Sequence, residues 1–337
     1  MRMKMMTGGM IALALVSCFG VAQAADIDPF LGRWALTIPG GGAGWLEVTE
    51  ERGYYDSSIL WGGGSVVPTA STYVVDDVLF VTRTHTTERK DKEGKVLRTQ
   101  TFTEVLRAQV DGDTISIIRH DPRRNGKGEN VEPFSGFRIA DLPPAPDLSK
   151  AKRGTPIELL KGNTLDGWSI MGTSPNAWTM ADGVLINEPE VNDDGSHVRS
   201  ANIRTDAEYE DFNLTTDVFV VTHSNSGIYL RGIYEVQVED SFEKETDAHT
   251  MGGLYSRISP SVKASKAPEQ WQHFDITLLD RHLTVILNGV TIIDNQPIKG
   301  CTGGAMTSDE SKPGPLYLQG DHGAVKYRNM VLTPLTN

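Results

Sequence analysis

Cysteine is scarce in this sequence, because among its 337 residues only Cys18 and Cys301 carry a thiol. Cys18 lies in an N-terminal segment that is typical of an export signal, so only Cys301 would remain after cleavage. No intramolecular disulfide can then form, and the fold must be held by its hydrophobic core. We therefore interpret Cys301 as an inert, half-buried thiol rather than as a nucleophile.

Positive charge is also in short supply, with 32 Lys and Arg against 44 Asp and Glu and a formal net charge of −12. Phosphate backbones and anionic membrane surfaces bind concentrated positive charge, so we expect neither nucleic acid nor a membrane surface as a partner. Beyond the N-terminus, no stretch approaches the roughly 20 apolar residues of a transmembrane helix. No transmembrane segment is expected, and a neutral or cationic small molecule remains open as a ligand.

The N-terminus has the three parts of an export signal. Arg2 and Lys4 make a positive start, residues 10–16 form an apolar run, and Ala22-Gln23-Ala24 is a small-residue cleavage site. Residues 1–24 are thus predicted to be a signal peptide, with the mature protein periplasmic or secreted. A second interpretation is a lipoprotein anchored at Cys18, because the residues before it resemble a bacterial lipidation motif.

Helical periodicity is missing as well, since no segment longer than about 12 residues repeats apolar residues at i, i+3, i+4 and i+7. Instead, 34 glycines and 17 prolines separate short stretches of alternating polarity. Asn288-Gly289, between two such stretches, predicts a two-residue hairpin turn, because both positions of a type I′ turn need positive φ. The chain is therefore predicted to be all-β and mostly antiparallel.

A Pro-rich linker at residues 142–156 predicts two domains, which also suits the length of the chain. Residues 25–141 contain alternating stretches between glycine-rich turns, which predicts a small β-meander or barrel. The early Gly32-Arg33-Trp34 is faintly lipocalin-like, and we expect Trp34 to seal one end of that barrel. Residues 157–337 form the second domain, which contains the candidate site.

One strand-turn-strand segment of the second domain carries the strongest candidate. Side chains alternate between the two faces of a strand, so Glu235, Gln237 and Glu239 share one face and the apolar residues between them share the other. A glycine bend would place the preceding strand alongside and add Tyr229 and Arg231 to this polar row. The alternative is an ordinary solvated sheet face.

A second candidate is the turn Gly320-Asp321-His322-Gly323, which lies between two short alternating stretches. Histidine is suited to proton transfer because its pKa lies near neutrality, and a neighbouring carboxylate can select its tautomer. The alternative is a surface turn in which Asp321 caps its own backbone.

These segments belong to a longer pattern, because residues 155–335 resemble the bacterial 3-keto-disaccharide hydrolase family. The Gly320-Asp321 link before His322 departs from the family pattern. The segments that carry the resemblance run in the family's order: Leu159-Leu-Lys-Gly-Asn-Thr-Leu-Asp-Gly-Trp168, Trp178, Tyr209-Glu-Asp-Phe-Asn-Leu214, Asn225-Ser-Gly-Ile228, Leu230-Arg-Gly232, Tyr234-Glu-Val-Gln-Val238, Gly253-Leu-Tyr255, Trp271, Leu287-Asn-Gly289, Leu318-Gln319, His322-Gly323 and Arg328-Asn329.

The resemblance implies a concanavalin A-like antiparallel β-sandwich (jelly roll) whose concave sheet holds a small carbohydrate. It also implies an activity on glycosides already oxidised at C3, with a sugar 3-dehydrogenase upstream as the enzyme that would supply them. A C3 ketone acidifies the hydrogen on C2, and the glycosidic oxygen on C1 lies β to that carbonyl. A base can therefore drive elimination, and water can add afterwards.

Such a site needs a base at C2, a donor or metal for the enolate oxygen and an acid for the leaving group. We expect Glu235 or His322 to be the base, and Asp321 or Asp240 to be its partner or the leaving-group acid. Further residues are expected to bind and polarise the substrate: Arg231, Gln237, Tyr229, Glu239, Gln319 and Asn225.

The use of a metal is left open, and no cofactor is assigned. Glu245, Asp247 and His249 form one compact acidic group and Asp193-Asp194 another, and neither has a spacing that singles out an ion. A divalent cation that assists the enolate remains possible chemistry for such a site.

Two other functions remain open. In retaining glucanases two carboxylates flank the bond at roughly 5 Å, but Glu235 and Glu239 are four strand residues apart, which separates their Cα atoms by about 13 Å. A non-catalytic carbohydrate-binding protein would stack sugars on exposed aromatic residues, for which Trp168, Trp178 and Trp271 are the candidates.

Overall fold

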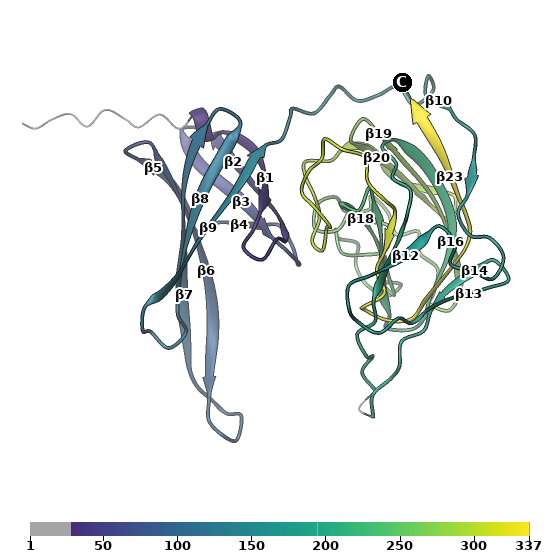
Figure 1. The fold of residues 1–337 in the computed structure, drawn as a ribbon, viewed down its shortest axis with the longest axis horizontal. Helices are drawn as coiled ribbons and strands as arrows, with labels where there is room; N and C mark the ends of the chain where they lie inside the picture. Colours follow the sequence, from purple (N-terminus) through teal and green to yellow (C-terminus); the bar gives the residue numbers. More distant parts are fainter. Residues whose placement is uncertain (1–27, 194, 337) are drawn as a thin grey trace, which may run out of the picture.

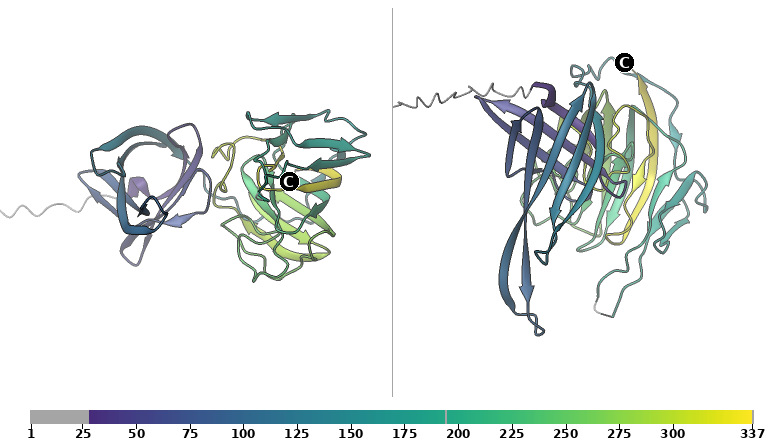
Figure 2. Two further views of the ribbon diagram at one scale, coloured as in Figure 1. Left: turned by 90° about the horizontal axis from the view of Figure 1, so that it is seen from below. Right: turned by 60° about the vertical axis from the view of Figure 1, so that its left-hand side comes forward.

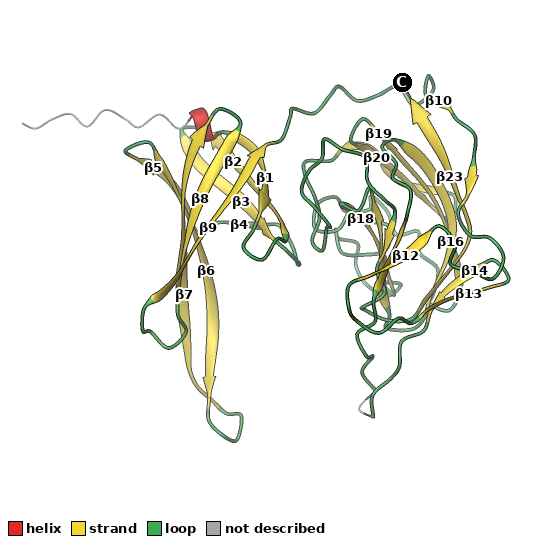
Figure 3. Ribbon diagram, in the orientation of Figure 1, coloured by secondary structure: helices red, strands yellow, loops and turns green. Residues whose placement is uncertain are grey.

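The computed structural model describes residues 28–193 and 195–336. The predicted signal peptide and the alternative lipid anchor at Cys18 lie outside the described residues. In the described ranges no helix has the length and apolar character needed to cross a membrane. Apart from the 3-10 helix η1 (Asp28–Phe30), the regular structure consists of strands (Figure 3). The predicted all-β fold class is confirmed.

The N-terminal half forms one nine-stranded antiparallel sheet in the order β4-β3-β2-β1-β9-β8-β7-β6-β5. Figure 2 shows this sheet curled into a ring, so the expected small barrel is present. Side-chain hydrogen bonds bring its two edges together, since Ser57 Oγ in β3 lies 2.6 Å from Thr72 Oγ1 in β5. The strands are β1 (Gly32–Thr37), β2 (Ala43–Glu51), β3 (Tyr54–Trp61), β4 (Val67–Pro68), β5 (Ser71–Val75), β6 (Val78–Lys90), β7 (Val96–Asp111), β8 (Thr114–Pro122) and β9 (Glu129–Arg138).

Trp34 closes one end of this barrel. Its indole is fully buried, and its Nε1 donates a hydrogen bond of 2.9 Å to the carbonyl oxygen of Phe30 in η1. The guanidinium of Arg138 lies over the same ring at 4.2 Å from its centroid. The indole thus fills the space between the sheet and the N-terminal turn, as expected for a structural tryptophan.

A connecting segment follows β9 and joins the two halves (Figure 1). Two short strands in it, β10 (Lys152–Arg153) and β11 (Ile157–Glu158), pair with the last strand of the chain, β23 (Val325–Thr336). The C-terminal part of the predicted linker is therefore already attached to the second domain.

The C-terminal half is a sandwich of two antiparallel sheets. One has the order β13-β14-β23-β16-β19-β20-β21, and the other has the order β12-β15-β22-β17-β18. Their strands are β12 (Trp168–Met171), β13 (Trp178–Ala181), β14 (Val184–Asn187), β15 (Asn202–Thr205), β16 (Phe212–Val220), β17 (Asn225–Leu230), β18 (Tyr234–Glu239), β19 (Trp271–Leu279), β20 (His282–Leu287), β21 (Val290–Pro297), β22 (Tyr317–Leu318) and β23.

The predicted hairpin turn at residues 288–289 is confirmed. Leu287 pairs with Val290 in the register of β20 and β21, so the loop has two residues. Asn288 and Gly289 have φ values of 52° and 83°, which is the left-handed backbone that a type I′ turn requires.

Strands β17 and β18 are buried on both faces, although β18 is the edge strand of its sheet. Their apolar side chains pack in the core between the two sheets. Residues 252–255 run along the free edge of β18, where the Tyr255 N–H donates to the carbonyl oxygen of Glu235 at 2.9 Å. The polar face of β17 and β18 is therefore covered by other segments of the chain and is not an open surface.

The two halves share packed side chains. Ala35, Trp45 and Leu60 of the N-terminal sheet belong to the same buried cluster as the sandwich core. The guanidinium of Arg257 lies 4.3 Å from the centroid of the Trp45 ring. Ser308 Oγ donates a 2.8 Å hydrogen bond to the carbonyl oxygen of Leu36. The N-terminal barrel is thus seated against the sandwich and is not a separately tethered module.

Replacing Trp34 by alanine should lower the free energy of unfolding by about 3–5 kcal/mol, because it leaves a cavity in the barrel core and removes a buried hydrogen bond. Urea unfolding followed by far-UV circular dichroism measures this. Tyr54→Ala is the control, since Tyr54 is 78% exposed and its loss should change stability by less than about 0.5 kcal/mol. Equal effects of the two substitutions would contradict a structural role for Trp34.

Candidate active site

A cavity of about 440 Å³ opens on the sheet that contains β17 and β18. This volume lies in the range of about 300–1,000 Å³ that is usual for small-molecule sites. Both domains contribute to its wall. The lining residues are Gly63, Gly64, Arg199, Asn202, Asn225, Tyr229, Glu235, Gln237, Tyr255, Gly303, Gly304, Tyr317, Gln319, Asp321 and His322.

Tyr229 and Glu235 form a buried pair at the bottom of this cavity. They are direct partners across β17 and β18, so their side chains lie side by side on the same face. The Tyr229 hydroxyl lies 2.9 Å from Oε2 of Glu235 and 2.8 Å from the carbonyl oxygen of Gly303. A glycine is needed at position 227, because a Cβ there would lie 2.3 Å from Oε1 of Glu235.

The carboxyl group of Glu235 holds its proton at neutral pH. Burial raises its pKa to about 8, the negative charge of Asp321 acts in the same direction, and the hydrogen bond from Tyr229 opposes them. A protonated Glu235 can donate to the Tyr229 hydroxyl while that hydroxyl donates to Gly303. The pair is therefore arranged to hold a transferable proton inside the cavity.

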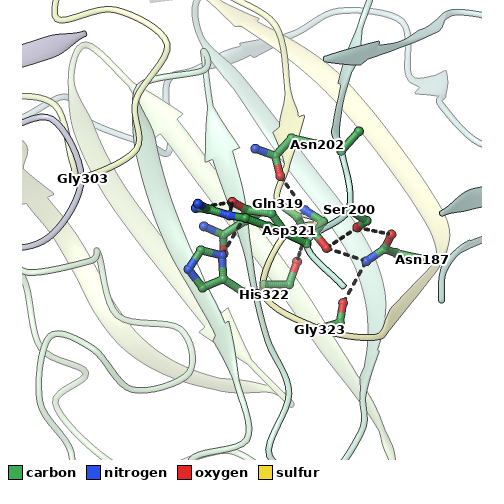
Figure 4. Close-up of polar contacts among 12 residues, drawn as sticks. Asn187, Ser200, Asn202, Gly303, Gln319, Asp321, His322 and Gly323 are labelled. Atoms are coloured by element: carbon green, nitrogen blue, oxygen red, sulfur yellow. Dashed lines mark hydrogen bonds and ion pairs between the residues drawn. The ribbon is translucent and has the colours of Figure 1, made fainter. Parts of the chain in front are cut away.

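Asp321 and His322 form a second titratable pair, shown in Figure 4. Oδ1 of Asp321 lies 2.7 Å from Nδ1 of His322, and Nε of Arg199 donates to Oδ2 at 2.9 Å. Burial alone would raise the pKa of Asp321, but its bonds to His322 and Arg199 lower it below the usual range. An ionised carboxylate only accepts hydrogen bonds, so Nδ1 of His322 carries a proton, and in the neutral imidazole the lone pair is then on Nε2.

The turn that carries this pair is held from behind by the sandwich (Figure 4). Nδ2 of Asn187 donates to the carbonyl oxygens of Gly320 and Gly323 at 2.9 and 2.8 Å, and Ser200 Oγ also donates to Gly320. Gly320 sits against Ala201, whose carbonyl oxygen would lie 2.3 Å from an added Cβ. The Gly320-Asp321 link thus directs Asp321 to the cavity, and Asp321 bonds to side chains rather than capping its own turn.

An aromatic pair forms another part of the wall. The rings of Tyr229 and Tyr317 stack with centroids 4.2 Å apart, and Nδ2 of Asn202 donates to the Tyr317 hydroxyl at 2.8 Å. Burial raises the pKa of both phenols, so they remain neutral hydroxyls. The Tyr317 hydroxyl accepts from Asn202, so its own proton can be donated to a substrate oxygen, and neither phenol can act as a base near neutral pH.

Three amides complete the polar lining: Gln237, Gln319 and Asn225. Gln237 is only 2% exposed, and its Oε1 has no hydrogen-bond partner among the described residues. A buried amide without a partner costs free energy, which a polar ligand or water at this position would offset. Gln237 is therefore well placed to bind a hydroxylated ligand.

The structure places three of the sequence-predicted site residues outside the cavity lining. The guanidinium of Arg231 donates to the carbonyl oxygens of Glu310 and Lys312. Its φ of 55° puts it in the turn between β17 and β18, where strand alternation no longer applies. Glu239 pairs with Lys244, and Asp240 accepts the backbone N–H of His223 at 2.9 Å.

Several cavity residues were not expected from the sequence, chiefly Arg199, Asn202 and the glycine pairs at 63–64 and 303–304. Arg199 and the glycine pairs lie in irregular segments, where no periodic pattern indicates which way a side chain points. Among these cavity residues, only Gly63 and Gly64 lie in a run of three glycines, residues 62–64, and that run belongs to the other domain.

The described residues contain no group of three or more His, Cys, Asp or Glu side chains arranged to hold a metal ion. In the acidic loop considered above, Nε2 of His249 lies 2.8 Å from Ser65 Oγ, and Asp247 accepts the His249 N–H at 2.8 Å. Asp194 lies outside the described residues.

The three tryptophans considered as sugar platforms do not line the cavity. Trp168 and Trp178 are buried in the sandwich core. The third, Trp271, lies beneath the guanidinium of Arg328 at 4.0 Å from the ring centroid.

Residues 155–333, more than half of the chain, match the model of the 3-keto-alpha-glucoside-1,2-lyase-like domain. The chain belongs to this family. The resemblance inferred from the motifs is confirmed, and the protein is a glycosidase-type enzyme that acts on carbohydrates.

The chain is also similar to several solved structures, at low identity. A glycosyl hydrolase candidate from Parabacteroides distasonis ATCC 8503 is 27% identical, with 57% of this chain and 93% of that chain covered and a TM-score of 0.42. A second one from the same organism is 19% identical, covers 54% and 94%, and has a TM-score of 0.43. The carbohydrate binding module CBM66 from Bacillus subtilis is 14% identical, covers 49% and 93%, and has a TM-score of 0.31. No curated protein sequence matches the chain.

Replacing Glu235 by glutamine should flatten the dependence of stability on pH. The carboxyl pKa is 4.5 in a solvated chain and about 8 in the folded protein. The folded state binds the Glu235 proton more tightly than the unfolded chain does. This tighter binding contributes fully to the stability of the folded state below about pH 4.5, and the contribution is lost as the pH rises towards 8. Between these two pH values, the free energy of unfolding of the wild type should fall by several kcal/mol more than that of Glu235→Gln. Urea unfolding at each pH measures this difference.

The control for this measurement is Glu190→Gln, which removes an exposed carboxylate from the same domain. Parallel stability profiles of Glu235→Gln and the wild type across this range would contradict a proton held by Glu235 in the folded state.

Proposed function

We propose that the protein is an exported enzyme that cleaves 3-keto glycosides by elimination at C1 and C2 followed by hydration. One observation carries the proposal: the buried carboxyl of Glu235, whose pKa burial raises, and the imidazole of His322, whose Nδ1 bonds to Asp321, line one sugar-sized cavity. An elimination across two neighbouring carbons needs such an acid and such a base at the same time.

The reaction starts at C2. Nε2 of His322 takes the C2 proton, and the electrons of the broken C–H bond form a C2–C3 double bond with negative charge on the C3 oxygen. Asp321 stabilises the resulting imidazolium, because its ionised carboxylate remains bonded to Nδ1. The sequence left Glu235 and His322 as alternative bases, and the raised pKa of Glu235 favours His322.

The second step breaks the bond between C1 and the glycosidic oxygen. The C3 carbonyl forms again, the electron pair moves to a C1–C2 double bond, and the leaving oxygen takes the proton of Glu235. Water then adds across C1–C2 to give the 3-keto sugar. Glu235 takes a proton from this water as the hydroxyl bonds to C1, and His322, whose half-exposed imidazole exchanges its proton with solvent, returns a proton to C2, so both groups regain their starting states. The side-chain amides of Gln237 and Gln319 line the same cavity, so their N–H groups serve as donors to substrate oxygens and the unpaired Oε1 of Gln237 accepts from a substrate hydroxyl.

The structure favours this reaction over that of a retaining glucanase. Of the described residues that line the cavity, only Glu235 and Asp321 carry carboxylates. Glu239, the expected second acid, is outside the lining. Both oxygens of Asp321 already accept hydrogen bonds, from His322 and Arg199, which makes Asp321 a poor nucleophile.

The proposal implies a place for the protein in a sequence of reactions. The substrate must reach it with C3 already oxidised, so a sugar 3-dehydrogenase must act first. The predicted signal peptide at residues 1–24 places the reaction in the periplasm or outside the cell.

The decisive experiment uses matched glycosides with and without the C3 ketone, each carrying deuterium at C2. We expect the purified mature protein to release the leaving group only from the 3-keto compound, with loss of the C2 deuterium to water and a primary isotope effect. Release from the unoxidised glycoside with deuterium retained would instead indicate an ordinary glycosidase. Binding without any release would indicate a carbohydrate-binding protein.

Glu235→Gln and His322→Ala should each lower kcat/KM for the 3-keto glycoside by roughly 10²–10⁴-fold, as is usual for a lost general acid or base. The wild-type kcat/KM should also fall as the pH rises above about 8, because Glu235 must be protonated. Glu50→Gln and His197→Ala, which change exposed residues, are the controls. Unchanged turnover in both site variants would remove these residues from the chemistry.

A further inference from the structure

The N-terminal domain supplies part of the wall of the candidate active site. Gly63 and Gly64, in the loop between β3 and β4, line the same cavity as Tyr229 and Glu235 of the sandwich. These residues are about 170 positions apart in the chain, so only the seating of the barrel against the sandwich brings them together.

Hydrogen bonds hold this loop in place from both domains. The Gly62 N–H donates to the carbonyl oxygen of Ala43 at 3.0 Å within the barrel. In the other direction, the Gly304 N–H donates to the carbonyl oxygen of Gly62 at 3.2 Å, and the Val66 N–H donates to Ser256 Oγ at 2.7 Å. Because both domains form hydrogen bonds with this loop, it is a fixed part of the cavity wall.

The wall consists of closely packed backbone. A Cβ added to Gly303 would lie 2.1 Å from the carbonyl oxygen of Gly64, so the two glycine segments touch directly. No hydrogen bond of the Gly63 or Gly64 N–H to another described residue is present. The Gly64 nitrogen is covered by Gly303, whereas a Cβ at Gly63 would meet nothing within 4 Å, which leaves the Gly63 N–H free to donate to a polar ligand such as a sugar hydroxyl.

The wall lies on the side of Glu235. The chain of hydrogen bonds runs from Glu235 through Tyr229 to Gly303, which packs on Gly64. The Asp321–His322 pair is held by other parts of the sandwich, namely Asn187, Ser200 and Arg199. In Figure 4 the purple N-terminal segment passes beside Gly303, at the opposite side of the view from Asn187.

We propose that residues 62–66 of the N-terminal domain form the end wall of the leaving-group subsite and restrict the enzyme to short 3-keto glycosides. This rests on the proposed function, in which Glu235 protonates the leaving oxygen, so that the leaving group extends past Glu235 towards Gly63 and Gly64. The cavity of about 440 Å³ is near the lower end of small-molecule sites. The leaving group admitted is therefore polar and no larger than one sugar ring.

The test compares three substrates: a methyl 3-keto glucoside, a 3-keto disaccharide, and a 3-keto trisaccharide oxidised at its non-reducing end. The wild type should turn over the first two and should show a kcat/KM at least roughly tenfold lower for the trisaccharide. A trisaccharide cleaved as well as the disaccharide would overturn the proposal.

Gly63→Leu then narrows the proposed subsite. Gly63 does not have a positive φ, and a Cβ there would meet nothing within 4 Å, so the backbone accepts a side chain. We expect kcat/KM for the disaccharide to fall roughly tenfold or more, while that for the methyl glycoside stays within about twofold. Gly154→Leu is the matched control, since Gly154 is exposed and its nearest neighbour, a side-chain atom of Pro334, would lie at 3.4 Å.

The outcomes separate this inference from the proposed function. If the wild type cleaves no 3-keto glycoside but binds them, the same ratios are read from dissociation constants measured by calorimetry. Three outcomes would overturn the proposed role of residues 62–66. These are an equal effect of Gly63→Leu on both substrates, no effect on either substrate, and no binding of any 3-keto glycoside. Thermal unfolding of Gly63→Leu at the wild-type temperature shows that the variant is folded.

Discussion

The burial of one carboxyl group, that of Glu235, is the constraint on which the rest of the site depends. A carboxylate on an open sheet would be ionised at neutral pH, whereas this one is covered and has a pKa raised to about 8. Its position depends on the space beside Gly227, on the hydroxyl of Tyr229 as a partner and on a cavity wall to which loops of both domains contribute. The environment of this group, more than its residue type, makes it an acid.

The second carboxyl group of the cavity, that of Asp321, is kept ionised, in contrast to Glu235. Asp321 is partly buried as well, but a guanidinium and an imidazole bond to its two oxygens and keep it ionised. Two carboxyl groups in one cavity thus have opposite protonation states. This separation of pKa values is how proteins obtain an acid and a base from similar side chains.

Much of this arrangement could be predicted from local pattern. Alternation with a period of two assigned Glu235 and Gln237 to one strand face, and Asn288-Gly289 marked a hairpin, because both features depend on near neighbours in the chain. The same rule failed at Arg231, where a left-handed turn interrupts the strand and turns the side chain to backbone carbonyls. Arg199 carried no pattern at all, since it lies in an irregular segment.

By itself, the sequence determined the all-β class, the export signal as a prediction, the family of the second domain and most of the polar residues of the site. These follow from composition, periodicity and short motifs, which act over a few residues. Only the tertiary structure decided that the polar row is buried, that Glu235 holds a proton, and that glycines of the N-terminal barrel close the cavity. Burial and contact between distant segments arise from packing, which no local pattern encodes.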